Sequence, residues 1–189
     1  RVKNSLQSVA SLVRVYKGRA ERGEDMADAF DAIGRRIEAT AALHQMLHDS
    51  PLDDAVMMDD FLKEIASLLQ DSAPDNVSIS CEASPVAIST SVASSIAVIV
   101  SEFVANSIKH AFVDSQSGHV AISGKSLADG TLEITCEDNG DANPESTAAK
   151  TSASGLGKRI MKASASQIGA TLENGPGPKG YRMVLTLPG

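Results

Sequence analysis

Between residues 2 and 47, apolar side chains recur mostly at every third or fourth position, in two successive runs. The first run consists of Val2, Leu6, Val9, Val13 and Tyr16, and the second of Phe30, Ile33, Ile37, Ala41 and Leu47. This spacing places the apolar side chains of each run on one face of a helix. A polar turn at 21–24 separates the runs, and Pro51 ends the second because proline disfavours helix at the preceding residue. Residues 1–52 are therefore predicted to form an antiparallel helical hairpin.

An isolated hairpin of this kind leaves an apolar stripe on each of its helices without cover. A second copy of the hairpin would bury both stripes in a four-helix bundle, so the sequence predicts a homodimer. The alternative is that the hairpin packs on the rest of its own chain, which would leave a monomer.

Beyond residue 52 the pattern alternates between helical and strand-like segments. Helices are expected over 57–69, 92–112 and 155–168, and strands over 77–81, 120–124, 132–136, 170–173 and 182–187. Turn-forming residues separate several of these segments, most clearly the Gly-, Pro- and Asn-rich stretch 174–180. This order predicts an α+β domain over residues 53–189, in which helices cover one face of a mixed, mainly antiparallel sheet.

The charge and composition of the chain narrow the choice of partners. A formal charge of -7 disfavours nucleic acid, because binding a phosphate backbone requires a concentrated basic face. The longest purely apolar run, 96–100, is far shorter than the roughly 20 residues that cross a bilayer, and no signal pattern precedes it. We therefore expect a cytoplasmic location and no membrane contact from this segment. Cys81 and Cys136 lie among alternating apolar residues, which predicts buried free thiols.

Three polar clusters in the second half of the chain could carry chemistry, and the first lies on the long predicted helix. Its members Glu102, Asn106, Lys109 and His110 are spaced so that they project from one side of that helix. An amide oxygen beside a carboxylate suits Mg²⁺, which takes oxygen ligands and leaves room for phosphates. Alone, the same pattern describes the solvated face of an amphipathic helix.

The second cluster, Glu137-Asp138-Asn139-Gly140, follows a predicted strand. A carboxylate at a strand end, next to a glycine that lets a ligand approach the backbone, could accept a hydrogen bond from an adenine amino group. The alternative is an ordinary turn, because Asn-Gly is a strong turn signal.

The third cluster, Ser154-Gly155-Leu156-Gly157-Lys158-Arg159, stands at the expected start of a helix. Its glycines expose backbone N–H groups, and the partial positive charge of a helix N-terminus favours a phosphate chain there. On its own a Gly-x-Gly is weak, and a flexible helix start accounts for it more simply. The preceding stretch 143–154, rich in Ala, Ser and Thr, is expected to be a mobile loop.

In this order the three clusters resemble the N, G1 and G2 boxes of the Bergerat ATP-binding fold, which histidine kinases, gyrase-type ATPases and anti-sigma-factor kinases share. The opening Arg1-Val2-Lys3-Asn4 is similar to the phosphoacceptor helix of HRVKN-type histidine kinases, close to the HWE kinases, in which a histidine directly precedes the arginine. The stretch Asn-Ser-Ile-Lys-His-Ala-Phe at 106–112 fits the same subfamily. The resemblance covers nearly the whole chain. It implies a dimerisation and phosphotransfer hairpin at 1–52 and an ATP-binding catalytic domain at 53–189.

The resemblance also implies a role for each cluster. It places around the nucleotide Asn106, Lys109, His110, Asp138, Gly140, Gly155, Leu156 and Gly157. Asn106 would ligate Mg²⁺ with Glu102 in support, and Asp138 would read the adenine of ATP. The loop 143–154 would be the ATP lid. Asn4, one helical turn after the expected phosphoacceptor, would position water for dephosphorylating the partner.

The activity that the resemblance implies is that of a sensor histidine kinase. The γ-phosphoryl group of ATP would pass to the histidine expected just before Arg1, and then to an aspartate on the receiver domain of a response regulator. Ala142 stands where a second glycine is expected, beside Asp141, and this favours the alternative of a degenerate phosphotransferase or phosphatase without productive ATP use. A protein-serine kinase of the anti-sigma type shares the ATP fold, but the N-terminal hairpin argues against it.

Overall fold

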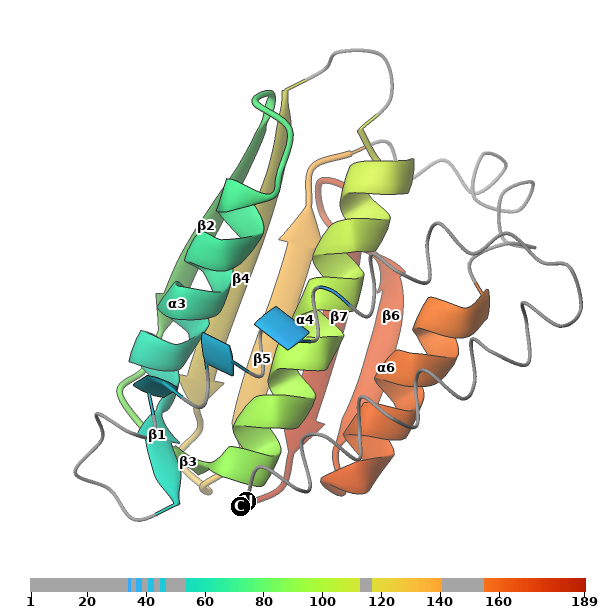
Figure 1. Cartoon of the computed structure of the whole chain (residues 1–189). Coiled ribbons are helices and arrows are strands. Elements are labelled where there is room, and N and C mark those ends of the chain that lie inside the picture. The colour runs from blue at the N-terminus through green and yellow to red at the C-terminus, as the bar shows by residue number, and fades with distance from the viewer. Residues whose placement is uncertain are drawn as a thin grey trace, which may run out of the picture.

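The computed structural model of the chain describes residues 54–112, 117–140 and 155–189, together with seven positions between 34 and 46 (Figure 1). Those positions are Gly34, Ile37, Glu38, Ala41, Ala42, Gln45 and Met46. All seven are helical, as the second run of the predicted hairpin requires, and Met46 packs against the core. The rest of the hairpin, including Asn4, lies outside the described residues, as do Asp141, Ala142 and the expected lid at 143–154.

Five strands form one mixed sheet in the order β2-β4-β5-β7-β6 (Figure 1). Their bounds are Val77–Ala83 (β2), Gly118–Ser126 (β4), Leu132–Asp138 (β5), Thr171–Pro176 (β6) and Tyr181–Leu187 (β7). β2 runs parallel to β4, and each of the other neighbouring pairs is antiparallel. The expected mixed, mainly antiparallel sheet is confirmed.

A separate two-stranded sheet, which the sequence did not predict, lies near the start of the described domain. It pairs β1 (Ala55–Met57) with β3 (Ala87–Ser89) in antiparallel register. Asp54, immediately before β1, has a positive φ of 60° and accepts hydrogen bonds from Thr90 through both its carbonyl oxygen and its side chain. These contacts fix the point at which the chain enters the domain.

Three helices lie on one face of the sheet (Figure 1). Their bounds are Met58–Asp71 (α3), Thr90–His110 (α4) and Gly155–Gln167 (α6). On the face that they cover, Ile122, Cys136 and Met183 pair in register across β4, β5 and β7, and each is at most 2% exposed. Ile99 and Val100 of α4 are fully buried in the same core. Removing this apolar surface from water is the main stabilising contribution to such a layer.

The central helix α4 begins where the Ser89 hydroxyl accepts a hydrogen bond from the backbone N–H of Val92 at 3.3 Å, an N-cap that satisfies one free donor of the first turn. By length and composition alone, α4 would suffice to cross a bilayer, and no other helix in the described ranges would. However, 72% of its apolar window is buried inside the protein. Its apolar surface is therefore used in packing on the sheet.

The end of β6 was predicted incorrectly from the sequence. A turn is expected over 174–180, but the strand continues to Pro176, which pairs with Tyr181. Proline is tolerated because β6 is an edge strand, whose outer side needs no N–H donor. The Gly177 N–H then donates to the Gly180 carbonyl at 2.7 Å and closes the shortened turn. As a result Tyr181 stands at the start of β7, beside the end of β5.

Candidate functional site

Asp138 is the last residue of β5 and is only 4% exposed. Its Oδ1 accepts hydrogen bonds from the backbone N–H of Gly140 at 3.1 Å and of Tyr181 at 3.0 Å. Its Oδ2 accepts one from the Ser107 hydroxyl at 2.8 Å. A buried carboxylate is costly unless it is hydrogen-bonded. Three donors from three parts of the chain therefore fix both the position and the orientation of this group.

Two glycines allow close packing around this carboxylate, Gly180 against Asp138 itself and Gly140 against Ala111. A Cβ atom at Gly180 would stand 2.5 Å from Oδ1 of Asp138 and 2.8 Å from the carbonyl oxygen of Gly140. A Cβ atom at Gly140 would collide with Ala111, at the end of α4. Neither position has room for a side chain, and only glycine avoids the conflict.

Glu102 and Asn106 lie on the side of α4 that faces α6, and both are half-buried. A Cβ atom at Gly157, in the first turn of α6, would stand 3.0 Å from Oε2 of Glu102 and 3.5 Å from Nδ2 of Asn106. Its distance from Oδ1 of Asn106 would be 3.8 Å. The carboxylate and the amide therefore flank one point beside the backbone of Gly157.

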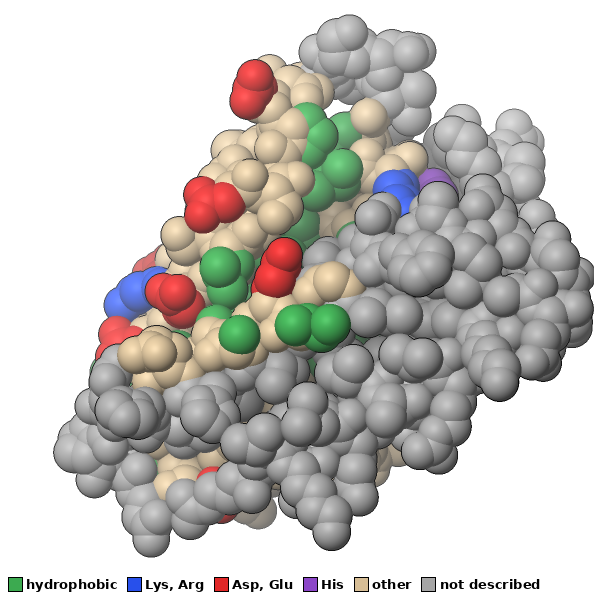
Figure 2. Space-filling view, viewed as in Figure 1, with side chains coloured by type: hydrophobic (Ala, Val, Ile, Leu, Met, Phe, Trp, Pro, Cys, Tyr) green, Lys and Arg blue, Asp and Glu red, His purple; other side chains and the backbone are tan. Residues whose placement is uncertain are grey.

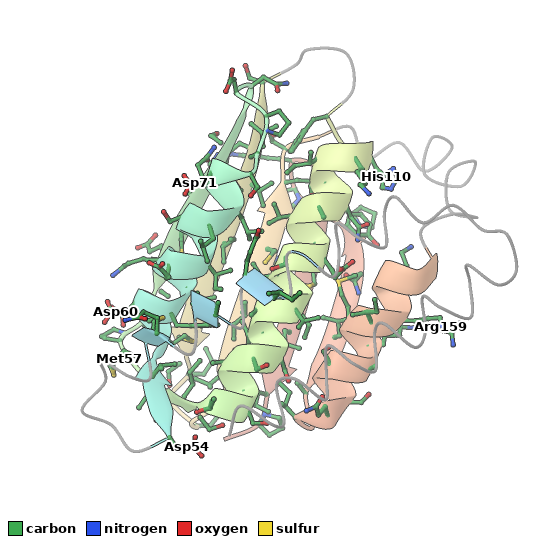
Figure 3. The ribbon with its side chains drawn as sticks, viewed as in Figure 1. Asp54, Met57, Asp60, Asp71, His110 and Arg159 are labelled. Atoms are coloured by element: carbon green, nitrogen blue, oxygen red, sulfur yellow. The ribbon has the colours of Figure 1, made fainter. Side chains whose placement is uncertain are left out.

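Lys109 and His110 form the last turn of α4, where both side chains are exposed. Figure 3 shows His110 at that end of the helix and Arg159 pointing outward from α6. Cationic side chains at a helix C-terminus also stabilise the helix by interacting with its dipole, which requires no ligand. Their position suits a phosphate chain, but the position alone does not demand one.

These contacts join the three clusters that the sequence identified. Ser107, which binds Asp138, directly follows Asn106, which lies against Gly157. One turn of α4 therefore connects the end of β5 with the start of α6. Gly155 and Leu156 open α6, and the structure describes their backbone but not the Leu156 side chain.

The pair Glu102 and Asn106 offers oxygen donors of the kind that Mg²⁺ takes. Among the described residues, no group of three or more His, Cys, Asp or Glu side chains could hold a metal ion. The pair therefore fits an ion whose remaining ligands are phosphate oxygens and water, and it does not fit a closed structural metal site.

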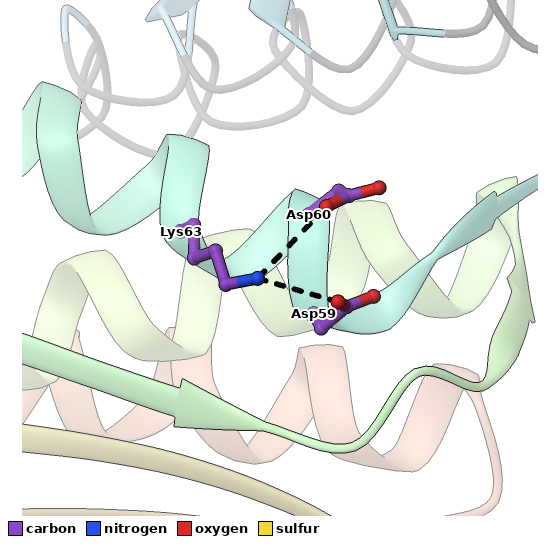
Figure 4. Close-up of polar contacts among 3 residues, drawn as sticks. All are labelled: Asp59, Asp60 and Lys63. Carbon is purple, nitrogen blue, oxygen red and sulfur yellow. Dashed lines mark hydrogen bonds and ion pairs between the residues drawn. The ribbon is translucent and has the colours of Figure 1, made fainter.

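Outside this region, acidic side chains gather on the outward face of α3 (Figure 2). Nζ of Lys63 lies 3.3 Å from Oδ2 of Asp59 and 4.0 Å from Oδ1 of Asp60 (Figure 4). The side chains of Lys63 and Asp60 are 57% and 67% exposed, and that of Asp59 is 18% exposed, so each pair has at least one partner in solvent. Exposed ion pairs of this kind contribute little to stability and define no binding site.

Ser107, Gly180 and Tyr181 touch the Asp138 carboxylate, yet the sequence did not identify them as site residues. One of these residues could have been found from the sequence. Ser107 is a hydroxyl residue on the same face of α4 as the buried Val100 and Phe103. A polar residue at such a position requires a hydrogen-bonding partner.

Residues 1–73 match the family model described as histidine kinase, and residues 91–189 match the model described as histidine kinase-, DNA gyrase B-, and HSP90-like ATPase. The chain is 28% identical over 193 residues to blue-light-activated histidine kinase 2 of Erythrobacter litoralis, a match that covers 100% of the chain and 55% of the relative. It is 28% identical over 165 residues to the sensor histidine kinase PdtaS of Mycobacterium tuberculosis, over 86% of the chain and 32% of that protein. The chain thus spans about half the length of the first relative and about a third of the second.

Solved structures show the same fold. A histidine kinase domain from the blue-light-activated kinase of Erythrobacter litoralis superposes with a TM-score of 0.74 at 23% identity, covering 100% of this chain and 94% of that one. The ATP-binding domain of PrrB from Mycobacterium tuberculosis gives a TM-score of 0.55 at 28% identity, covering 72% and 98%. The predicted Bergerat-type sandwich is confirmed by these likenesses.

Proposed function

The chain belongs to the histidine kinase-, DNA gyrase B-, and HSP90-like ATPases, and from this premise we propose that it is the core of a two-component sensor histidine kinase. The γ-phosphoryl group of ATP passes to a histidine, which the resemblance places directly before Arg1. It then passes to an aspartate on the receiver domain of a response regulator. The observation that carries the proposal is that one turn of α4 carries both Ser107, which hydrogen-bonds Asp138, and Asn106, whose amide would lie 3.5 Å from a Cβ atom at Gly157.

In this proposal Asp138 accepts a hydrogen bond from the amino group of adenine, since a buried and oriented carboxylate is an acceptor without donors of its own. Gly140 and Gly157 let the backbone approach the nucleotide, and the first turn of α6, from Gly155 through Leu156, directs N–H groups toward the phosphates. Lys109 and His110 lie at the phosphate end of the site and balance its negative charge.

Asn106 would hold Mg²⁺ together with the phosphates, and Glu102 would support it. When bound, Mg²⁺ neutralises charge on the phosphoryl group during transfer. The side chains of this domain otherwise act by positioning, since phosphoryl transfer needs little covalent chemistry from the protein.

The proposal extends to the partners of the chain. The helical hairpin at 1–52 would dimerise, because its apolar stripes need cover, and it would present the phosphoacceptor to the ATP domain and to the response regulator. Asn4 would position water for dephosphorylating that regulator. The chain would work in the cytoplasm, where ATP and receiver domains are found together.

The test follows phosphate from γ-labelled ATP into the longer protein that includes the residue before Arg1. The expected product is a label that is stable in base and lost in acid, as phosphohistidine requires. Replacing that histidine with Gln should abolish the label while leaving Mg-ATP binding intact. Acid-stable label on a partner serine would instead support the anti-sigma type of kinase.

The sequence at Asp141 and Ala142 favours one alternative, a degenerate phosphotransferase or phosphatase that acts on a response regulator without productive ATP use. Mg-ATP titration separates the two functions. Saturable binding below millimolar concentration supports the kinase, whereas absence of binding, with dephosphorylation of a phosphorylated receiver domain intact, supports the alternative.

A further inference from the structure

The hydrogen bonds around Asp138 can be assigned atom by atom. A carboxylate offers two oxygens with two lone pairs each and no donor. Oδ1 already accepts two backbone N–H groups, from Gly140 and Tyr181. Oδ2 accepts the Ser107 hydroxyl, which leaves Oδ2 one lone pair for a ligand.

The same hydrogen bond fixes the orientation of the Ser107 hydroxyl. A serine has one O–H hydrogen, and here that hydrogen points at Oδ2 across 2.8 Å. The lone pairs of Oγ can therefore only accept. Because Oγ and Oδ2 are neighbours, a base edge that reaches the free lone pair of Asp138 also meets an acceptor on Ser107.

We propose that Ser107 is a specificity-determining residue of the nucleotide site, because its Oγ places a second acceptor beside the carboxylate of Asp138 and so strengthens selection of 6-amino over 6-keto purines. This inference rests on the proposed ATP site. An exocyclic amino group has two N–H donors to place against the two acceptors. A 6-keto oxygen would face the same two acceptors without any hydrogen between them, and buried polar groups left unpaired oppose binding.

The same arrangement predicts that the substitution Asp138→Asn reverses the base preference of the site. In Asp138→Asn, the two backbone N–H groups of Gly140 and Tyr181 still require an oxygen at the Oδ1 position. The new amide nitrogen must then face Ser107 and donate to its Oγ, which frees the serine hydrogen to point toward the base. Both groups become donors, and the preference of the site should turn toward a 6-keto purine.

The experiment titrates the whole chain with Mg-ATP and with Mg-ITP, which carries a 6-keto group where ATP carries the 6-amino group. The wild type should prefer ATP by about 100-fold, since a site built for hydrogen bonding rejects an analogue that cannot make the bonds. Ser107→Ala should reduce the ratio of the two affinities at least tenfold, chiefly by improving ITP. Asp138→Asn should bind ITP more tightly than ATP.

Ser95→Ala is the matched control, because Ser95 is another serine on α4 that is 4% exposed and lies well before the site residues in the helix. Its ratio of affinities should equal that of the wild type. A structural role for Ser107 would weaken both nucleotides in parallel and leave the ratio unchanged, and that result overturns the inference while the ATP site stands. If the wild type binds neither nucleotide, the proposed function itself fails.

Discussion

A Cβ atom at Gly157 would stand 3.0 Å from Oε2 of Glu102, so the first turn of α6 leaves little space for a side chain beside the carboxylate of α4. The carboxylate and the neighbouring Asn106 amide are held against the backbone of another helix. In a site for phosphates and Mg²⁺, such close approach gives the ligand access to backbone N–H groups.

Gly157→Ala should therefore weaken nucleotide binding without lowering the stability of the domain. Alanine favours a helix over glycine by as much as about 1 kcal/mol, so the thermal midpoint should stay level or rise. The added methyl group displaces the Glu102 carboxylate, and the dissociation constant of Mg-ATP should increase about tenfold, a change of about 1.4 kcal/mol. Both quantities are measured on the same variant by calorimetry.

Gly175→Ala serves as the control, because a Cβ atom there would meet nothing within 4 Å. It should leave nucleotide affinity unchanged. If Gly157→Ala lowers the thermal midpoint and affinity together, the glycine serves packing and the functional interpretation is wrong.

Removing Mg²⁺ should reveal the role of Asn106. In Asn106→Ala the amide group beside Gly157 is lost, including the oxygen proposed to ligate Mg²⁺, and we expect ATP affinity with excess Mg²⁺ to fall at least tenfold. With EDTA present, the wild type and the variant should bind ATP equally weakly, because the lost interaction passes through the metal. Asn174→Ala, an exposed asparagine of β6, should behave as the wild type in both conditions. A deficit of the same size with and without Mg²⁺ would assign Asn106 to direct contact with the nucleotide.

Local patterns were sufficient to place most elements of the ATP domain. The long helix α4 could be predicted because the run 96–100 is apolar on every side, as expected of a helix buried in a core. β1 and β3 could not, since strands of three residues are too short to show a period. The parallel pairing of Val77 with Gly118 also lay beyond local patterns, because α4 intervenes between the two strands.

In the site, too, local patterns identified single residues but not the contacts between elements. Asn106 and Asp138 could each be identified from the residues around them, but the bond that connects their elements could not. Ser107 and Asp138 are 31 residues apart, and their contact depends on the register of α4 over β5. The hydrogen bond from the Tyr181 N–H to Asp138 depends further on the length of the turn after β6, and the turn is shorter than predicted from the sequence. Distances between elements are set by tertiary packing, which periodicity does not encode.

Gln70 protects the free edge of the sheet, and its loss should destabilise the domain. Its Nε2 donates to the Val77 carbonyl at 3.0 Å, and its Oε1 accepts from the Ile79 N–H at 2.7 Å. β2 is an edge strand, so these two backbone groups have no partner strand on that side. Gln70→Met should lower the free energy of unfolding by about 1 to 3 kcal/mol, measured by urea denaturation. Mg-ATP affinity should not change.

Gln167→Met provides the comparison, because Gln167 is exposed at the end of α6. It should change the free energy of unfolding by less than about 0.5 kcal/mol. Equal effects of the two substitutions would show that the edge contacts of Gln70 contribute nothing.

Cys136 should make the domain less stable in mild base. It is a free thiol, fully buried, and burial raises its pKa far above the usual value, with a smaller contribution from Cys81. In the unfolded chain the thiol loses its proton above a pH of about 8.5, whereas the folded thiol keeps it. Unfolding then releases a proton, so this contribution to stability is complete below pH about 8.5 and declines above it, by up to about 1.4 kcal/mol per pH unit.

Cys136→Ala removes this titration, although it leaves a small cavity that lowers stability at neutral pH. The difference in unfolding free energy between wild type and variant should therefore be largest near pH 7.5 and shrink as the pH rises toward 9.5. Burial also raises the pKa of Tyr181, but that group titrates at higher pH and is present in both proteins. Cys81→Ala should alter the slope less, because Cys81 is half-buried and the charge of Lys63 opposes the upward shift of its pKa. Parallel curves for wild type and Cys136→Ala would mean that the Cys136 thiol ionises as readily in the folded protein as in the unfolded chain.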